Sequence, residues 1–311
     1  MERVYHYTSM NALLKLLESV ETSSDKKSFV FRATNIFFLN DPQEFVYGQN
    51  VLMEVLNEIE YEKEINHNLR ISSLFSRHTE KTEKEWLKIL LDDIHDKNAS
   101  PYVISFSRNI DSLPMWLNYG DHGKGICLAF AEYRSRVLGS DFTPSSIDEV
   151  KVEIYDSLGT YDVNYDVESV KKEDNILRKQ IEKIYDFYLN NVKMIQPNEL
   201  FELQRGMLNA FTEVIAPYIK SKEYEGEKEV RLAKTVLRDK GNTTKEINFR
   251  CNAKGNIVPY IDIEIPQEQL DYVSIGPLAD KELSIKVIEM MKNKFGLKFD
   301  VKESKVKYRE Y

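Results

Sequence analysis

Apolar and polar residues alternate at the start of the chain and then give way to helical spacing. The stretch "RVYHYTS" ends in Thr8 and Ser9, two residues that favour the N-cap position of a helix. The following "MNALLKLLESV" carries its leucines at the spacing of a buried helical stripe. The pattern predicts a strand that runs directly into a helix.

Further strands are expected where short apolar runs or alternating patterns lie between turn residues. The stretch "SFVFRATNIFFLN" predicts two short strands or one bent strand, and "KVEIYD" and "YDVNYD" flank the "SLGT" turn like the arms of a hairpin. The other expected strands are "PYVISFS", "KGICLAF", "EKEVRLAKTV", "NIVPYIDIEI" and "LDYVSIG".

Helical patterns fill two long sections and the region near the end of the chain. Asp41 is the expected cap of the first section, Pro42 its first helical residue, and Asn198 a cap within the second. The stretch "DKELSIKVIEMMKNKFG" predicts an amphipathic helix closed by Gly296. Without an internal repeat or linker, the chain is predicted to be a single α+β domain over residues 1–311, with helical insertions at about 43–95 and 167–219.

Composition describes a soluble globular protein, because 42% of the 311 residues are hydrophobic and 30% are charged. The net charge of −8 disfavours general nucleic-acid binding, although a local basic groove stays possible. Cys127 and Cys251 form no spaced pair, and we interpret them as reduced thiols of a cytoplasmic protein. The start "MERVYHYTS" has no apolar signal region and no apolar run approaches 18 residues, so neither secretion nor a membrane span is expected.

Several common chemistries have no motif in this chain. The sequence contains no phosphate-binding loop, dinucleotide fingerprint, zinc-protease motif or serine-hydrolase elbow, and "GDHGKG" has the wrong spacing for a phosphate loop. The five histidines lack ligand spacing, so no metal site is expected. A metal-dependent nuclease is the least supported of the functions considered.

Three places carry the remaining candidate chemistry. His6 lies in the first strand, where it is either a half-buried histidine with one hydrogen bond or a donor to a ligand hydroxyl. Trp116 and Tyr119 project to the same side of a short helix in "SLPMWLNYGDHGKGICLAF", either as core residues or as an aromatic platform over a cleft. In a strand, the charged residues of "EGEKEVRL" share one face, which is either solvated or suited to a polar ligand: Glu227, Glu229 and Arg231.

These stretches together resemble a bacterial family known as a domain of unknown function. The resemblance rests on "YHYTS", "NDPQEF", "ISFSRNIDSLPMWLNYGDHGKGICLAF" and "EKEVRL" in this order. The motif order is in turn similar to that of the ADP-ribosyl superfamily of the histidine–tyrosine–glutamate type. That similarity implies an ADP-ribosyltransferase-like split β-sheet core.

The resemblance also implies roles in binding NAD as a substrate. His6 would bind a ribose, Tyr119 would stack on nicotinamide, and Glu229 would meet the nicotinamide ribose, with Glu227 as the first glutamate of a glutamate-x-glutamate pair. Glu229 would then stabilise the positive charge that develops when the glycosidic bond breaks. The remaining expected contacts are Trp116 beside Tyr119 as a π-face, Thr8 and Ser105 as neutral hydrogen-bonding partners, and Arg231 or Arg32 facing the pyrophosphate.

The predicted function is therefore an NAD-dependent ADP-ribosyltransferase, or the allied NAD glycohydrolase, acting as a bacterial toxin or phage-defence effector. Its acceptor would be a protein, a nucleic acid or a small molecule. The alternative is a non-catalytic module that senses a nucleotide or makes protein contacts. The environment of Glu229 separates the two: an enzyme needs it open to the cleft near His6 and Tyr119, whereas a structural protein can bury it against a lysine.

Overall fold

The computed structural model describes residues 2–39, 44–76, 99–132, 159–193, 196, 199–237, 246–252 and 255–308. Its strands are β1 (Arg3–Thr8), β2 (Ser28–Asn35), β3 (Ala99–Ser107), β4 (Ile126–Ala131), β5 (Gly159–Asp162), β6 (Glu229–Leu237), β7 (Asn248–Cys251), β8 (Ile257–Pro266), β9 (Leu270–Ile275) and β10 (Asp300–Glu303). Its helices are α1 (Met10–Glu18), α2 (Glu44–Glu62), α3 (Ser72–Ser76), α5 (Leu113–Tyr119), α7 (Val167–Val170), α8 (Ile176–Val192), α9 (Leu200–Val214) and α10 (Lys281–Phe295). The chain thus combines α and β structure, as the sequence predicted.

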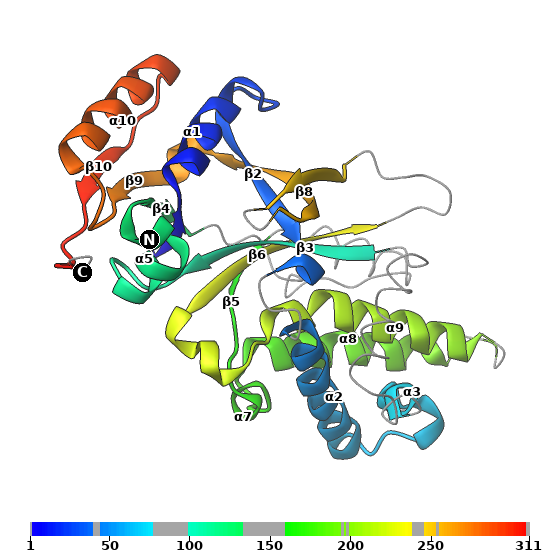
Figure 1. Cartoon of the computed structure of the whole chain (residues 1–311). Helices are drawn as coiled ribbons and strands as arrows, with labels where there is room; N and C mark the ends of the chain where they lie inside the picture. The colour runs from blue at the N-terminus through cyan, green and yellow to red at the C-terminus, as the bar shows by residue number, and fades with distance from the viewer. Residues whose placement is uncertain are drawn as a thin grey trace.

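The strands form an open, mostly antiparallel sheet in the order β10-β9-β4-β1-β3-β2-β8-β7, with β6 paired to β3 and β5 paired to β6 (Figure 1). Only the pairing of β9 with β10 is parallel among the described strands. Strand β3 has three neighbours, which is one more than a strand has edges. The sheet therefore forks at β3.

The register shows how the fork is made. Strand β6 pairs with β3 along its whole length, from Ala99 to Ser107, and so occupies one edge. On the other edge β1 pairs only at Ser107, while β2 pairs at Tyr102 and Val103. On this edge of β3, the residues between Val103 and Ser107 therefore face a gap. On one side of the gap the sheet continues as β1-β4-β9-β10, and on the other side as β2-β8-β7.

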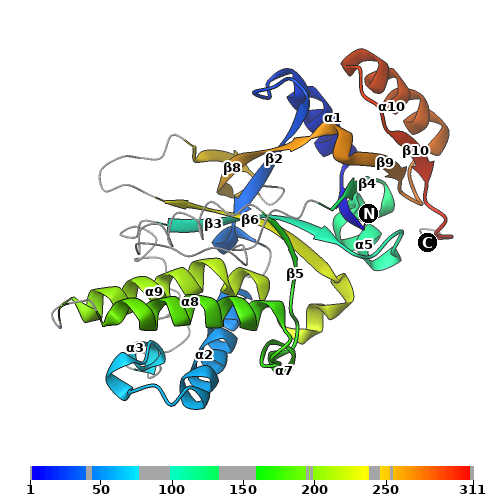
Figure 2. The same cartoon turned by 180° about the vertical axis from the view of Figure 1, so that it is seen from behind.

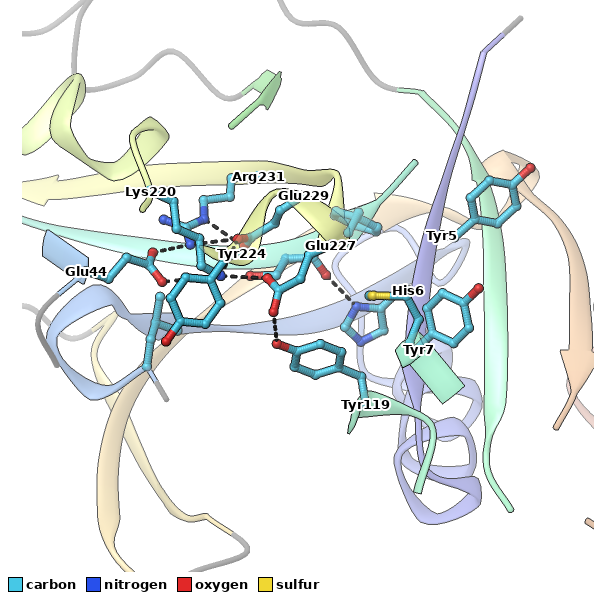
Figure 3. A pocket seen from close by; sticks show the side chains of 14 residues that line it. Tyr5, His6, Tyr7, Glu44, Tyr119, Lys220, Tyr224, Glu227, Glu229 and Arg231 are labelled. Atoms are coloured by element: carbon cyan, nitrogen blue, oxygen red, sulfur yellow. Dashed lines mark hydrogen bonds and ion pairs between the residues drawn. The ribbon is translucent and has the colours of Figure 1, made fainter. Parts of the chain in front are cut away.

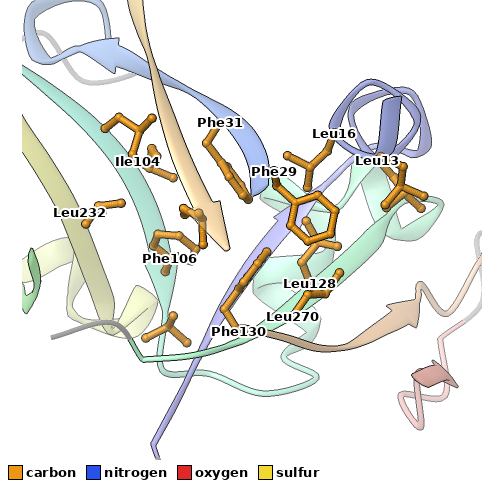
Figure 4. Packing of buried hydrophobic residues seen from close by; sticks show 14 of the residues in the cluster. Leu13, Leu16, Phe29, Phe31, Ile104, Phe106, Leu128, Phe130, Leu232 and Leu270 are labelled. Atoms are coloured by element: carbon orange, nitrogen blue, oxygen red, sulfur yellow. The ribbon is translucent and has the colours of Figure 1, made fainter. Parts of the chain in front are cut away.

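Helices cover both faces of this sheet (Figures 1 and 2). Val103 and Ala233 pack into a cluster with α2, α8 and α9, whereas Ile104 and Leu232, one residue along each strand, pack with α1 and α10. Because successive side chains of a strand point to opposite faces, the two helical groups lie on opposite sides of the sheet. Figure 4 shows the second cluster, in which Phe29, Phe31, Phe106 and Phe130 pack together and against α1.

Several predicted elements are confirmed with their caps. Ser9 caps α1 by accepting a hydrogen bond from the Ala12 amide, and Gly296 ends α10 in the left-handed conformation with φ 64°. The stretch expected as one bent strand or two is β2 followed by a 3-10 helix over Ile36–Phe38. The expected caps Asp41 and Asn198, and the first arm of the expected hairpin, lie outside the described residues.

The helical sections contain α2 and α3 in the first and α7, α8 and α9 in the second. No helix in the described part of the chain has the length and apolar character needed to cross a membrane. Cys127 is buried, Cys251 is exposed, and neither is in a disulfide.

Candidate functional site

A pocket of about 290 Å³ opens at the fork of the sheet (Figure 3). Ser105, Glu229 and Arg231 lie on the face of β3 and β6 that carries α2, α8 and α9, and Glu44 at the start of α2 also lines the pocket. Helix α5 covers the neighbouring part of the same face, where Tyr5 and Tyr7 of β1 pack with Met115. The pocket is lined by Tyr5, His6, Tyr7, Leu39, Glu44, Ser105, Phe106, Met115, Tyr119, Lys220, Tyr224, Glu227, Glu229 and Arg231.

His6 lies at the fork because of the gap beside β3. The backbone carbonyl of Ser105 faces this gap, and His6 Nδ1 lies 2.8 Å from its oxygen. A carbonyl can only accept a hydrogen bond, so Nδ1 carries the proton and Nε2 is an acceptor in the neutral ring. Burial lowers the pKa of His6, which favours that neutral form. The imidazole thus closes an open backbone position and keeps one nitrogen that can bind a ligand hydroxyl.

The two aromatic residues of α5 have different environments, although they are one helical turn apart. Tyr119 lines the pocket and is 36% exposed, while Trp116 is fully buried. Trp116 donates from Nε1 to Asp111 Oδ1 at 2.9 Å and packs edge-on against Tyr7 at 4.9 Å between ring centroids. The structure therefore places Trp116 in the core under the pocket wall, away from the stacking position expected for it.

Gly125 follows α5 at a place where the backbone of β1 comes very close. A Cβ atom on this residue would lie 2.1 Å from the carbonyl oxygen of Thr8, so no side chain fits. The requirement for glycine here is one of strand packing. Thr8 lies at the end of β1, paired with Ile126, and does not line the pocket.

The glutamate pair reaches the pocket in a way that the strand pattern did not predict. Glu229 and Arg231 share one face of β6, as expected, but Glu227 is the last residue of a 3-10 helix over Lys222–Glu227. Lys228 between them adopts the left-handed conformation with φ 43°. The expectation that Glu227 belongs to the strand is wrong, and a turn brings its carboxylate to the same pocket.

Five charged side chains form one network in the wall of the pocket, which we call the charged cluster: Glu44, Lys220, Glu227, Glu229 and Arg231. Lys220 Nζ lies 2.7 Å from Glu227, 3.1 Å from Glu229 and 3.5 Å from Glu44. Arg231 binds both oxygens of Glu229, at 2.8 and 2.9 Å.

Two further contacts tie the charged cluster to its surroundings. Arg231 also pairs with Glu44 and donates to the carbonyl oxygen of Pro217 at 2.5 Å. At the open side, the Tyr119 hydroxyl donates to Glu227 at 2.5 Å (Figure 3). Tyr119 is thereby connected to Lys220 through a single carboxylate.

The pKa values of the charged cluster reflect two opposing effects, because burial disfavours the charged form of each group and the neighbouring ion pairs favour it. Burial by itself would raise the pKa of Glu229, but Arg231 and Lys220 outweigh it and hold that pKa at about 2. Burial raises the pKa of Glu44, and its two cationic neighbours do not fully offset this. Burial would lower the pKa of Lys220, but the surrounding carboxylates raise it. Glu229 and Lys220 are therefore charged at neutral pH.

Glu229 is 5% exposed and Arg231 1% exposed, so the charged face of β6 is not solvated. The guanidinium of Arg231 is taken up by Glu229, Glu44 and Pro217, which leaves it buried behind the carboxylate and not free to face a pyrophosphate. Arg32 lies outside this pocket.

Sequence reasoning missed Glu44, Lys220 and Tyr224. Glu44 belongs to the "NDPQEF" stretch, one of those on which the expected resemblance rests, so this motif was a usable signal. Lys220 comes directly after a helical section, and no local sequence pattern marks it as a site residue. The ring centroid of Tyr224 lies 4.5 Å from Lys220 Nζ. No group of three histidine, cysteine, aspartate or glutamate side chains within the described ranges has the arrangement of a metal site.

Comparison with known proteins gives one match to part of the chain. Residues 115–232 match a family model described as "Protein of unknown function (DUF2971)". The matched stretch covers less than half of the chain and includes Tyr119, Lys220, Glu227 and Glu229. No curated protein and no solved structure matches the chain. The match supports the expected resemblance of this stretch to a family of proteins of unknown function.

Proposed function

We propose that the pocket binds NAD and transfers its ADP-ribosyl group to an acceptor or to water. One observation carries the proposal: His6, Tyr119 and Glu229, which are far apart in the sequence, line one pocket at the fork of the sheet. These are the residue types that the resemblance implied for ribose binding, nicotinamide stacking and stabilisation of the developing charge. Their roles come from that resemblance, and their convergence supports it.

The reaction breaks the bond between the ribose C1′ carbon and the nicotinamide nitrogen. Nicotinamide leaves with the bonding electron pair, and the acceptor atom forms the new bond to C1′ and loses its proton to solvent or a carboxylate. The transition state carries positive charge on the ribose, as in glycoside hydrolysis. A fixed negative charge beside C1′ lowers this barrier.

The charge balance of the charged cluster suits such a transition state. It contains three carboxylates and two cations, so one negative charge is in excess when all five groups are ionised. The tyrosines of the pocket supply π-faces for a cationic ring, a contact of about 0.5–2 kcal/mol. Neutral His6 adds no opposing charge.

The non-catalytic alternative is favoured by a specific observation. Glu229 is buried against Lys220 and Arg231, which is the arrangement of a structural ion pair. A pocket of this kind can bind a nucleotide without consuming it. The two functions therefore differ in what happens to bound NAD.

The test incubates the protein with labelled NAD and a bacterial lysate and measures NAD consumption, NAD affinity and melting temperature. Glu229→Gln keeps the shape of the side chain, and we expect it to retain the fold and most of the affinity for NAD. Turnover should fall by roughly a hundredfold to a thousandfold, or about 2.7–4 kcal/mol.

The matched control is Glu225→Gln, in an exposed residue of the same 3-10 helix that does not line the pocket. Its turnover should equal that of the wild type. Binding of NAD without turnover by the wild type would establish the non-catalytic alternative. The proposed reaction would be ruled out if the wild type neither binds nor consumes NAD, and the role of Glu229 in it would be ruled out if a folded Glu229→Gln kept wild-type turnover.

A further inference from the structure

Two arginines lie near each other on the branch of the sheet away from α5, and we call Arg32 and Arg250 the arginine pair. Arg32 and Thr34 lie on the same side of β2, and Thr34 is paired with Val103 of β3. Val103 lies two residues from Ser105, which lines the pocket. Because side chains alternate along a strand, the arginine pair projects from the same face of the sheet as the pocket.

Each arginine is held by a neighbour on another strand. Arg250 of β7 donates from Nη2 to the Thr34 hydroxyl at 2.8 Å. The guanidinium carbon of Arg32 lies 5.2 Å from the centroid of the Tyr260 ring on β8. Thr34 and Tyr260 are themselves partners in the ladder of β2 and β8, which lie side by side in Figure 1. The two guanidinium groups are therefore held next to a single pair of ladder partners, Thr34 and Tyr260.

This arrangement is electrostatically unfavourable by itself. Burial lowers the pKa of Arg250, and the charge of Arg32 lowers it further. Arg250 Nε is buried and has no hydrogen-bond partner among the described residues. A buried donor without a partner costs about 1–3 kcal/mol, and like charges add to that cost.

The nearby acid does not balance the pair. Asp262 is directly opposite Arg32 in the ladder and receives a hydrogen bond from Asn248 at 3.3 Å. Burial raises the pKa of Asp262, against the opposing effect of Arg32. With Asp262 ionised, Arg32, Arg250 and Asp262 together still carry one positive charge in excess.

We propose that the arginine pair binds a phosphate group of a small phosphate-bearing ligand. A phosphate offers several acceptor oxygens and up to two negative charges, so it can accept hydrogen bonds from both guanidinium groups at once. Arg32 is exposed, which leaves the site open to solvent.

This site does not depend on the proposed reaction of the pocket. Its recognition requires only a phosphate group, which a free nucleotide or a nucleic acid can each present. The expected ligand is small because the net charge of the chain is −8, which opposes a polyanion.

The experiment titrates inorganic pyrophosphate, ADP and a single-stranded oligodeoxynucleotide into the wild type, Arg32→Gln and Arg250→Gln, by calorimetry at low and physiological ionic strength. The control is Arg3→Gln, which removes an exposed arginine from the other branch, where Asp271 pairs with it. We expect saturable binding of pyrophosphate and ADP by the wild type, at least roughly tenfold weaker binding by both arginine-pair variants, and a change of less than about twofold in Arg3→Gln.

Melting temperatures distinguish phosphate binding from a purely structural role of the arginines, because only binding makes the melting temperature depend on added pyrophosphate. Without ligand, Arg32→Gln should melt at the wild-type temperature or above it, because it removes the repulsion on Arg250. Pyrophosphate should raise the melting temperature of the wild type and not that of Arg32→Gln. Arg32→Gln also tests the site if Arg250→Gln fails to fold.

The proposal is overturned if the wild type binds neither pyrophosphate nor ADP saturably, or if Arg3→Gln loses as much affinity as the arginine-pair variants. Tighter binding of the oligonucleotide than of ADP at physiological ionic strength would overturn the assignment to a small ligand.

Discussion

Two buried glutamates, Glu60 in the helical layer and Glu229 in the pocket, are held in opposite ways. Glu60 is fully buried, and within the described part of the chain it accepts hydrogen bonds only from neutral groups. These are the amides of Ile71 and Ser72, at 2.8 and 3.0 Å, the Ser72 hydroxyl, and the Tyr185 hydroxyl at 2.8 Å. Glu229 is held by the charged groups of Arg231 and Lys220.

The difference separates a structural carboxylate from one that can take part in binding. Glu60 ties the start of α3 to α2 and α8, and its hydrogen-bonding capacity is used by fixed groups of the fold. Glu229 shares its cations with two further carboxylates, in a pocket where negative charge is in excess. Substitutions in each place should therefore act through different energies.

The largest effect on stability is expected from Lys220→Met. This change removes a buried cation and leaves three carboxylates with Arg231 as the remaining cation of the cluster. Breaking a buried ion pair from one side costs about 3–5 kcal/mol. Urea unfolding at neutral pH should show a loss of this size.

The control for that measurement is Lys222→Met, in an exposed residue at the start of the 3-10 helix that ends at Glu227. It should change the free energy of unfolding by less than about 0.5 kcal/mol. Adding Glu44→Gln to Lys220→Met should recover part of the loss, because it removes one of the uncompensated charges. Equal losses in the two lysine variants would contradict the importance of the cluster.

An intermediate effect is expected from acidification. The pKa of Glu229 is about 2 in the folded protein and about 4.3 in an unfolded chain, so the folded state favours the ionised form. Its contribution, on the order of 2–3 kcal/mol, is fully present above pH 5 and is lost as the pH falls toward 2. The unfolding free energy of the wild type minus that of Glu229→Gln should shrink over this range, and a constant difference would exclude the depressed pKa.

The smallest effect is expected from Glu60→Gln. The amide oxygen can still accept hydrogen bonds from the Ile71 and Ser72 amides, and the amide nitrogen can donate to the Ser72 hydroxyl. We expect a loss of about 1 kcal/mol by urea unfolding, with little change in ligand binding. A loss as large as that of Lys220→Met would mean that neutral and charged donors stabilise these carboxylates alike.

Local pattern accounts for much of the fold and for part of the candidate site. The passage from β1 to α1, the strand β4 and the helix α10 follow from periodicity and caps, which depend only on neighbouring residues. The pattern also brought Glu229 and Arg231 to one face of β6. It failed at Glu227, because the left-handed residue Lys228 separates Glu227 from β6, which begins only at Glu229.

The rest of the site depends on contacts between distant segments. Spacing on α5 cannot show that Trp116 is covered by Tyr7 while Tyr119 is not, since both lie on one side of the helix. Lys220 and Glu44 form an ion pair although they are 176 residues apart in the sequence. No local pattern can indicate such a contact. The fork that places His6 beside Ser105 is likewise a property of the sheet register.

The fork also has a consequence for the growing polypeptide. Strand β3 receives β1 and β2 from the start of the chain on one edge, but its other edge waits for β6, which begins at Glu229. The roughly 220 residues between His6 and Glu229 take on the order of ten to forty-five seconds to synthesise. Throughout that interval His6 exists without Glu229 and Arg231, and Tyr119 joins it only about halfway through. A nascent chain therefore has no complete pocket, and any activity of this site begins only after β6 has been synthesised.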